Sequence, residues 1–154
     1  MYSREDSKNI REKFWNGFKS WSGRKRTRLG KPGRWMMNDT GMRQVRLKFH
    51  FDENTALAGI EIDTKNLDKR IELWEKFESL KNLFVEKCPF ESAWELEYPL
   101  TDNKTVSRIY DQLLNVSIYN PECWKQVNDF LYSRMLFFED FFTEYRDFLK
   151  YGKI

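Results

Sequence analysis

The sequence is poor in the residues that most often carry chemistry. It has two cysteines, Cys88 and Cys123, too few for a disulfide scaffold, which predicts a reducing, cytoplasmic location. Its single histidine, His50, excludes a metal site built from several histidines and weakens any mechanism that pairs histidine with a serine or cysteine nucleophile. The sequence contains no nucleotide-binding glycine pattern, catalytic triad or metal-ligand constellation. We therefore expect no cofactor and no metal, and the sequence favours a non-enzymatic protein.

Long hydrophobic segments are also absent. No run approaches 18 consecutive apolar residues, so we expect no transmembrane helix. Residues 1–6 lack the apolar core of a secretory signal. The chain of 154 residues is 40% hydrophobic and 33% charged, as is ordinary for a globular protein, and its 17% of aromatic residues can build a substantial core. We expect a single domain over residues 1–154 without membrane contact.

Hydrophobic periodicity predicts an α+β fold. Apolar residues spaced by three or four indicate an amphipathic helix, whereas strict alternation indicates a strand with one buried face. The predicted order is helix, hairpin, helix, two strands and long helix, with a short, mainly antiparallel sheet of about four strands packed against helices. The ranges that fit are helices at 3–21, 66–87 and 121–149, strands at 42–51, 56–62, 94–98 and 105–110, a short edge strand at 116–119, and a basic flexible loop at about 22–41.

Positive charge is concentrated in the first third of the chain. Residues 1–51 hold 14 lysines and arginines against 4 acidic residues, whereas residues 52–154 hold 13 against 20. Six of the cations fall within residues 24–34, bracketed by Trp21 and Trp35. This asymmetry indicates either a basic surface offered to a polyanion or two halves that neutralise each other when folded.

Clustered cations beside aromatic rings are typical of nucleic-acid binding, because lysine and arginine replace phosphate counterions and planar side chains stack on unpaired bases. We predict that the chain binds nucleic acid or another polyanion through this loop and the polar face of the first strand. The open alternative is a solvated loop, with Arg46 and Lys48 paired across strands to Glu95 and Glu97. The candidate nucleic-acid-binding residues are Arg24, Lys25, Arg26, Arg28, Lys31, Arg34, Trp35, Arg46 and Lys48.

A charged residue inside a predicted strand has two interpretations. If Arg108 shares a strand face with Val106 and Tyr110, it needs an anionic partner. An internal ion pair with Glu61 is favoured over a functional anion site.

A short acidic motif also raises the question of catalysis. Asp63-Thr64-Lys65 matches a D-x-K string, with Asp52, Glu53 and Glu61 upstream of it, and such carboxylates can hold Mg²⁺ for phosphodiester cleavage. However, Asp52 and Glu53 fall in a predicted turn, and Asp63 and Thr64 are suited to capping a helix. A vestigial metal-dependent nuclease is therefore the third and least favoured hypothesis.

The last predicted helix carries more aromatic residues than one buried face requires. Its additional rings suggest the alternative function of a protein–protein interaction or homo-oligomerisation module, with a protein partner or a second copy docked on this helix. The rings that widen its apolar face are Phe130, Phe137, Phe141 and Phe148.

The order of several short motifs resembles a known family. These motifs are Arg11–Trp15, Trp35, Gly59–Ile62, Trp94–Leu96 and Thr105–Tyr110. In this order they resemble the bacterial domain-of-unknown-function family DUF4268, and the resemblance covers nearly the whole chain. Members of that family occur alone or attached to nuclease-like domains of the PD-(D/E)xK kind, so the resemblance implies a nucleic-acid setting. The family has no established activity and therefore supplies no catalytic residues.

Overall fold

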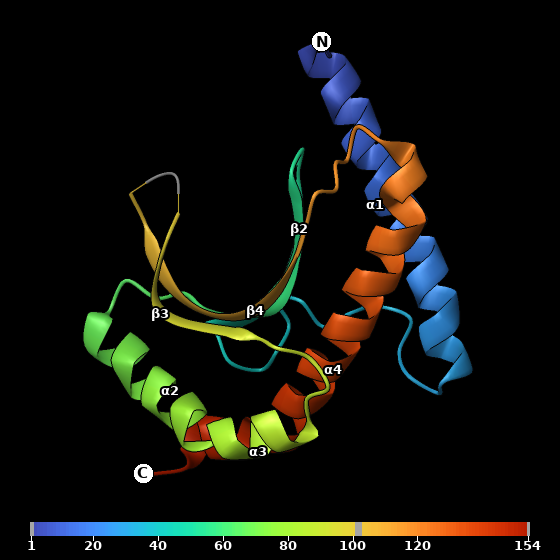
Figure 1. Cartoon of the computed structure of the whole chain (residues 1–154). Coiled ribbons are helices and arrows are strands. Elements are labelled where there is room, and N and C mark those ends of the chain that lie inside the picture. The colour runs from blue at the N-terminus through green and yellow to red at the C-terminus, as the bar shows by residue number, and fades with distance from the viewer. Residues whose placement is uncertain (1, 101–102, 154) are drawn as a thin grey trace. The chain divides into compact units, whose positions relative to one another are not determined.

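The computed structural model describes residues 2–100 and 103–153 and confirms the α+β class (Figure 1). The four strands in these ranges form one antiparallel sheet in the order β1–β2–β4–β3. None of the described helices is long and apolar enough to cross a membrane. The elements in chain order are α1 (Arg4–Arg28), β1 (Val45–Phe51), β2 (Thr55–Ile62), α2 (Leu67–Ser79), α3 (Lys81–Lys87), β3 (Ala93–Pro99), β4 (Thr105–Leu114), a 3-10 turn (Pro121–Cys123) and α4 (Trp124–Tyr151).

The chain divides into two compact units. One, the α1 unit, combines α1 with the tip of the β1–β2 hairpin, the end of β4 and the start of α4. The other, the sheet unit, holds α2, α3, β3 and the remaining parts of the sheet and of α4. Within the described residues, the α1 unit lies in 1–35, 49–57 and 112–133, and the sheet unit lies in 36–48, 58–111 and 134–154.

Helix α1 contributes an aromatic face to the core of the α1 unit. It begins where the Ser3 hydroxyl accepts the backbone N–H of Asp6 at 3.0 Å, a capping contact that satisfies one of the free donors of the first turn. The buried ring of Phe14 meets Phe51 and Trp124 edge-on, with ring centroids 4.8 and 5.3 Å apart. Helix α1 therefore runs beside the first part of α4 (Figure 1).

The irregular segment after α1 is shorter than predicted, because the helix continues to Arg28 instead of ending at residue 21. The buried stripe of Phe14 and Phe18 extends at four-residue spacing to Ser22 and Arg26, both also buried. The glycine and the run of cations in residues 22–28 favour a loop when the sequence is considered alone. The buried contacts of Ser22 and Arg26 instead stabilise two more helical turns. The irregular segment spans residues 29–44.

Residues 66–87 form two helices where the sequence predicted one. The Ser79 hydroxyl donates to the carbonyl of Lys76, and the backbone N–H of Leu80 donates to the carbonyl of Phe77 at 2.9 Å. These contacts tighten the last turn of α2, as back-bonding serines often do. The break at Leu80 separates α2 from α3, and Phe84 of α3 is buried against Phe137, Phe138 and Phe141 of α4.

The edge strand predicted at 116–119 does not form. Residues there make only two backbone contacts with the hairpin tip, from the N–H of Val116 to the Asn54 carbonyl and from the N–H of Ile118 to the Asp52 carbonyl, at 3.3 and 2.9 Å. Asn115 has φ of 61°, a left-handed conformation that ends the extended path of β4. The alternating apolar pattern at Val116 and Ile118 reflects burial without a continuous ladder.

The start of the final helix is confirmed. Asn120 accepts the backbone N–H of Glu122 at 3.2 Å, and Pro121 occupies the first position of the 3-10 turn that leads into α4. Proline suits that position because a first-turn residue needs no backbone donor.

Gly59 is required by the close approach of β4. A Cβ atom added at Gly59 would lie 2.5 Å from the carbonyl oxygen of Ile109 and 2.7 Å from Cβ of Tyr110. Backbone atoms at these distances cannot move aside without displacing the strand. We therefore expect Gly59→Ala to lower the free energy of unfolding by about 2–3 kcal/mol, measured by urea denaturation.

The matched control is Gly17→Ala on α1. A Cβ atom there has no neighbour within 4 Å, so the same chemical change is expected to stabilise the helix by about 0.5–1 kcal/mol. Equal effects of the two substitutions would contradict the close-approach explanation.

Candidate nucleic-acid interface

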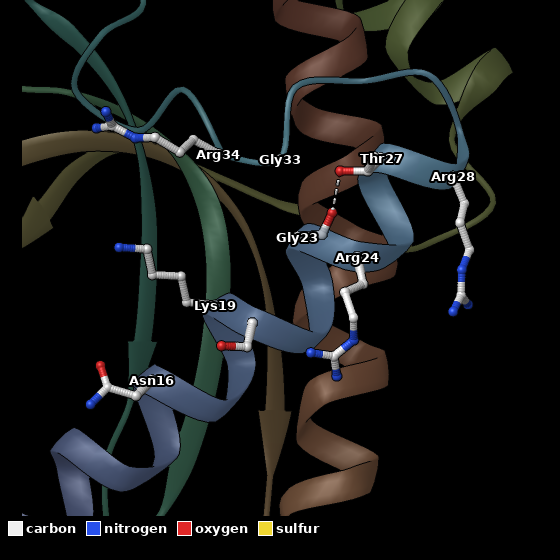
Figure 2. Close-up of a pocket in the computed structure, with 9 residues that line it drawn as sticks. Asn16, Lys19, Gly23, Arg24, Thr27, Arg28, Gly33 and Arg34 are labelled. Carbon is white, nitrogen blue, oxygen red and sulfur yellow. Dashed lines mark hydrogen bonds between the residues drawn. The ribbon is translucent and has the colours of Figure 1, made fainter.

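A hollow of about 1030 Å³ lies between α1 and the segment that returns after it (Figure 2). We call this hollow the basic groove. Four of its lining residues are cations, three more carry a hydroxyl or amide, and none is acidic. The nine lining residues are Asn16, Lys19, Ser20, Gly23, Arg24, Thr27, Arg28, Gly33 and Arg34.

Helical spacing explains how α1 supplies most of the basic groove. Lining residues recur three and four positions apart from Asn16 to Arg28, which places them on one side of the helix. That side faces away from the stripe begun by Phe14 and Phe18. In the view of Figure 2, the side chains of Lys19 and Arg34 extend to the left, whereas those of Arg24 and Arg28 extend downward.

A pair of glycines brings the returning segment close to α1. A Cβ atom at Gly23 would lie 3.3 Å from the carbonyl oxygen of Gly33, and one at Gly33 would lie 3.6 Å from Oγ1 of Thr27. The Thr27 hydroxyl donates to the Gly23 carbonyl at 2.9 Å, which keeps this turn of the helix compact (Figure 2). Small residues at the crossing therefore place Arg34 at the edge of the same hollow as Arg24 and Arg28.

Arg26 fixes the path of the returning segment from inside the α1 unit. Its side chain is only 2% exposed, and its Nε and Nη2 donate to the carbonyls of Pro32 and Arg34 at 2.8 and 3.2 Å. The guanidinium also stacks on the Trp35 ring, 4.0 Å from its centroid. Arg26 thus positions the segment that carries Arg34.

The two tryptophans that bracket the basic segment pack inside the α1 unit. Trp35 donates its indole N–H to the Ser22 hydroxyl at 3.1 Å and meets Phe49 and Tyr132 edge-on. Trp21 packs on Tyr132, and the Lys25 ammonium lies 5.1 Å from the Trp21 centroid. These rings shape the segment, and their contacts are with other side chains of the unit.

The structure separates the nine predicted site residues. Arg24, Arg28 and Arg34 line the basic groove, whereas Lys25, Arg26 and Trp35 belong to the aromatic cluster beneath it. Lys31 is half-buried next to the segment held by Arg26. Arg46 and Lys48 lie in the sheet unit and are both half-buried.

Sequence reasoning missed six of the nine lining residues: Gly23, Thr27 and Gly33 within the predicted basic loop, and Asn16, Lys19 and Ser20 before it. The last three are the informative omissions. They lie upstream of the charge cluster, but they share its helix face. The signal that reveals them is the continuation of α1 to Arg28, because helical spacing then aligns Lys19 with Gly23 and Ser20 with Arg24.

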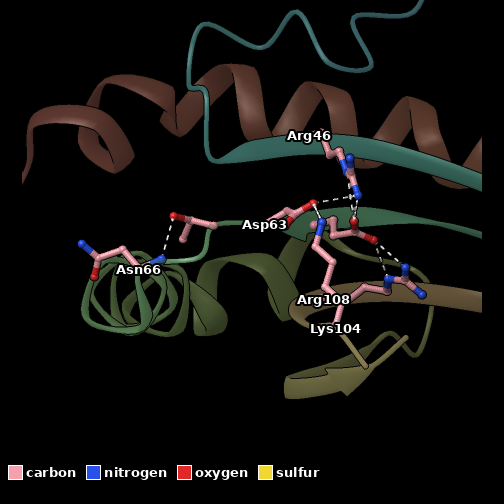
Figure 3. Close-up of polar contacts among 7 residues, drawn as sticks. Arg46, Asp63, Asn66, Lys104 and Arg108 are labelled. Carbon is pink, nitrogen blue, oxygen red and sulfur yellow. Dashed lines mark hydrogen bonds and ion pairs between the residues drawn. The ribbon is translucent and has the colours of Figure 1, made fainter. Parts of the chain in front are cut away.

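The predicted internal ion pair of Arg108 is confirmed and belongs to a larger network. Glu61 is fully buried, and its two carboxylate oxygens accept from Nε of Arg46 at 2.9 Å and from Nε of Arg108 at 3.0 Å. Arg108 also stacks on Tyr98, 4.0 Å from the ring centroid. The alternative partners predicted for Arg46, Glu95 and Glu97, are wrong: Arg46 pairs with Glu61 and with Asp63, the latter at 3.0 Å (Figure 3).

Two carboxylates of the D-x-K hypothesis, Asp63 and Glu61, are bound by cations. Asp63 accepts from Arg46 and from Lys104, and Glu61 lies between two arginines. Within the described ranges no three histidine, cysteine or acidic side chains are grouped as a metal site would require. The geometry therefore supplies no observation in favour of the nuclease hypothesis.

His50 and Asp52 form an exposed pair at the hairpin tip, where the structure confirms the predicted turn. Their side chains are 2.9 Å apart. Partial burial acts to raise the pKa of Asp52, but hydrogen bonds from the backbone of Asn54, from His50 and from the backbone of Thr55 outweigh it and lower that pKa. Asp52 thus organises the turn as an ionised carboxylate.

Comparison with known proteins gives one match. A family model described as Domain of unknown function (DUF4268) matches residues 10–146. No curated protein matches the chain, and no solved structure does. The matched range includes every residue that lines the basic groove.

Proposed function

The chain belongs to the DUF4268 family, whose description names no function, and from the basic groove we propose that it binds nucleic acid through the phosphate backbone. The observation that carries this proposal is a hollow lined by Lys19, Arg24, Arg28 and Arg34 without any carboxylate. Guanidinium and ammonium groups are the main donors to phosphate oxygens, and neighbouring hydroxyls and amides add neutral donors.

Recognition of phosphate is favoured over recognition of bases. Stacking on unpaired bases requires a well-exposed ring, whereas both tryptophans next to the basic groove are half-buried and pack against Tyr132. Among the groove residues only Asn16 carries the amide that most often reads adenine edges. We therefore propose binding with little dependence on base sequence.

This proposal makes a quantitative prediction about salt. If all four groove cations contact phosphate, log K falls with log salt concentration with a slope of about −3.6 on duplex DNA, or about 150-fold in affinity from 50 to 200 mM salt. Replacing one of them with alanine should reduce the magnitude of the slope by about 1. The measurement is fluorescence anisotropy of labelled single- and double-stranded DNA and RNA, titrated at several salt concentrations.

The decisive variant replaces all four groove cations, Lys19, Arg24, Arg28 and Arg34, with alanine. Its control removes equal charge from exposed sites outside the groove, namely Arg43, Lys125, Lys150 and Lys153. Loss of binding in the groove variant alone supports the proposal. Equal loss of affinity in both variants would mean that binding depends only on net charge, which would contradict the proposal.

Failure of the unmodified chain to bind any nucleic acid at low salt would also contradict the proposal. Concentration-dependent self-association in that case would favour the alternative of an oligomerisation module on α4. The rings of Phe137 and Phe141 contact Phe84 of α3, so part of the aromatic surplus of α4 packs within the sheet unit.

A further inference from the structure

The sheet unit holds a second cationic cavity, where β2 leads into α2 beside the start of β4. We call it the β2–α2 cavity; it has a volume of about 260 Å³. Three of its lining residues are cations, two are threonines and none is acidic. The lining residues are Thr64, Lys65, Leu67, Arg70, Lys104 and Thr105.

The ion network next to this cavity contains more cations than carboxylates. Asp63 forms ion pairs with both Arg46 and Lys104, with N–O distances of 3.0 and 2.8 Å (Figure 3). Glu61 likewise forms ion pairs with both Arg46 and Arg108. Two carboxylates are thus shared among three cations, one of which, Lys104, also lines the cavity. An added anion there would balance the surplus charge.

Arg70 lines the cavity, and its guanidinium is fixed by contacts with other residues. Its side chain is 6% exposed and donates to the Ser107 hydroxyl at 2.8 Å and to the Leu96 carbonyl. Its Nη2 pairs with Glu97 at 3.2 Å, and the Glu97 side chain is 62% exposed. A guanidinium has five N–H donors, and these contacts use three of them. Arg70 is therefore held in place by its other partners and need not be ordered by a ligand.

The threonines add neutral donors. The Thr64 hydroxyl oxygen accepts the backbone N–H of Asn66 at 3.3 Å, so its hydrogen can point to another acceptor. Thr105 is exposed at the start of β4, and Lys65 is exposed beside α2. Two hydroxyls and three cations around a cavity of this size suit a compact oxyanion with several acceptor atoms.

We propose that the β2–α2 cavity binds a phosphoryl group, either as free phosphate or as the phosphate end of a small molecule. A phosphate dianion offers several strong acceptors and matches the surplus positive charge better than a carboxylate does. This site lies in a different compact unit from the basic groove and does not depend on nucleic-acid binding.

The test is isothermal titration calorimetry of the full chain with inorganic phosphate and, separately, with adenosine monophosphate, at constant ionic strength. Loss of one charge-assisted donor corresponds to about tenfold in affinity, so Lys65→Ala should weaken binding about tenfold. Thr105→Val should weaken it severalfold. Both residues are exposed, so neither change should perturb folding. Tighter binding of phosphate indicates a site for the free ion, and tighter binding of the monophosphate indicates a site for a phosphate ester.

Two control variants test whether binding is specific to the β2–α2 cavity. Lys125→Ala removes an exposed cation from the α1 unit, and Arg24→Ala removes a cation from the basic groove; both should leave binding unchanged. The proposal is overturned if neither probe binds at millimolar concentration. It is equally overturned if Lys65→Ala and Thr105→Val bind as the unmodified chain does, or if the Lys125 or Arg24 variant loses binding to the same extent.

Discussion

Replacing Glu61 with alanine is expected to lower the free energy of unfolding by about 3–5 kcal/mol, because it leaves buried cations without their counter-charge. Arg108 is 7% exposed and Arg46 is 32% exposed, and both donate to this one carboxylate. The Arg108 guanidinium is affected most, because it is buried and water cannot readily replace the lost carboxylate acceptor. The measurement is urea denaturation followed by far-ultraviolet circular dichroism.

Glu97→Ala is the matched control for this prediction. Glu97 also pairs with a buried arginine, Arg70, but the carboxylate itself is largely exposed and Arg70 keeps its bonds to Ser107 and Leu96. Its loss should cost about 1 kcal/mol or less. Similar costs for Glu61→Ala and Glu97→Ala would show that burial of the Glu61 network is not what stabilises the sheet unit.

The partner of Glu61 illustrates what strand periodicity can and cannot predict. Alternation along residues 105–110 suffices to place Arg108 with the core residue Val106, and a buried arginine needs a carboxylate. The alternative that pairs Arg46 with Glu95 or Glu97 is wrong, because both carboxylates lie on β3. The sheet order sets β1 next to β2 and far from β3, and pairing between distant segments is not encoded in local periodicity.

Helix boundaries depend on similar long-range contacts. Ser22 and Arg26 are poor evidence for a buried face when read locally, because serine and arginine are usually exposed. Both are buried where Trp35 folds back over them, with its ring on Arg26 and its indole N–H on Ser22. The same contacts decide which cations line the basic groove. The sequence alone could therefore locate the cationic segment, but it could not predict which of its cations line the groove and which are buried.

Arg26→Ala is therefore expected to lower both stability and nucleic-acid affinity, whereas Arg24→Ala is expected to lower mainly affinity. Removing Arg26 takes the donors from two carbonyls and the stacked cation from Trp35, at a cost of about 3 kcal/mol in the free energy of unfolding. Nucleic-acid affinity should fall as well, since Arg34 loses its support. Arg24 is exposed, so Arg24→Ala should change stability by less than about 0.5 kcal/mol while reducing affinity and the salt slope.

Arg26→Lys separates charge from geometry. Lysine keeps the positive charge but has neither the planar face that stacks on Trp35 nor the fork that reaches Pro32 and Arg34 together. We expect it to recover only a minor part of the lost stability in urea denaturation, and anisotropy should show a correspondingly partial return of affinity. Full recovery by lysine would mean that Arg26 acts through its charge, as the other cations do. If Arg26→Ala proved as stable as Arg24→Ala, Arg26 would not be what holds the returning segment against α1.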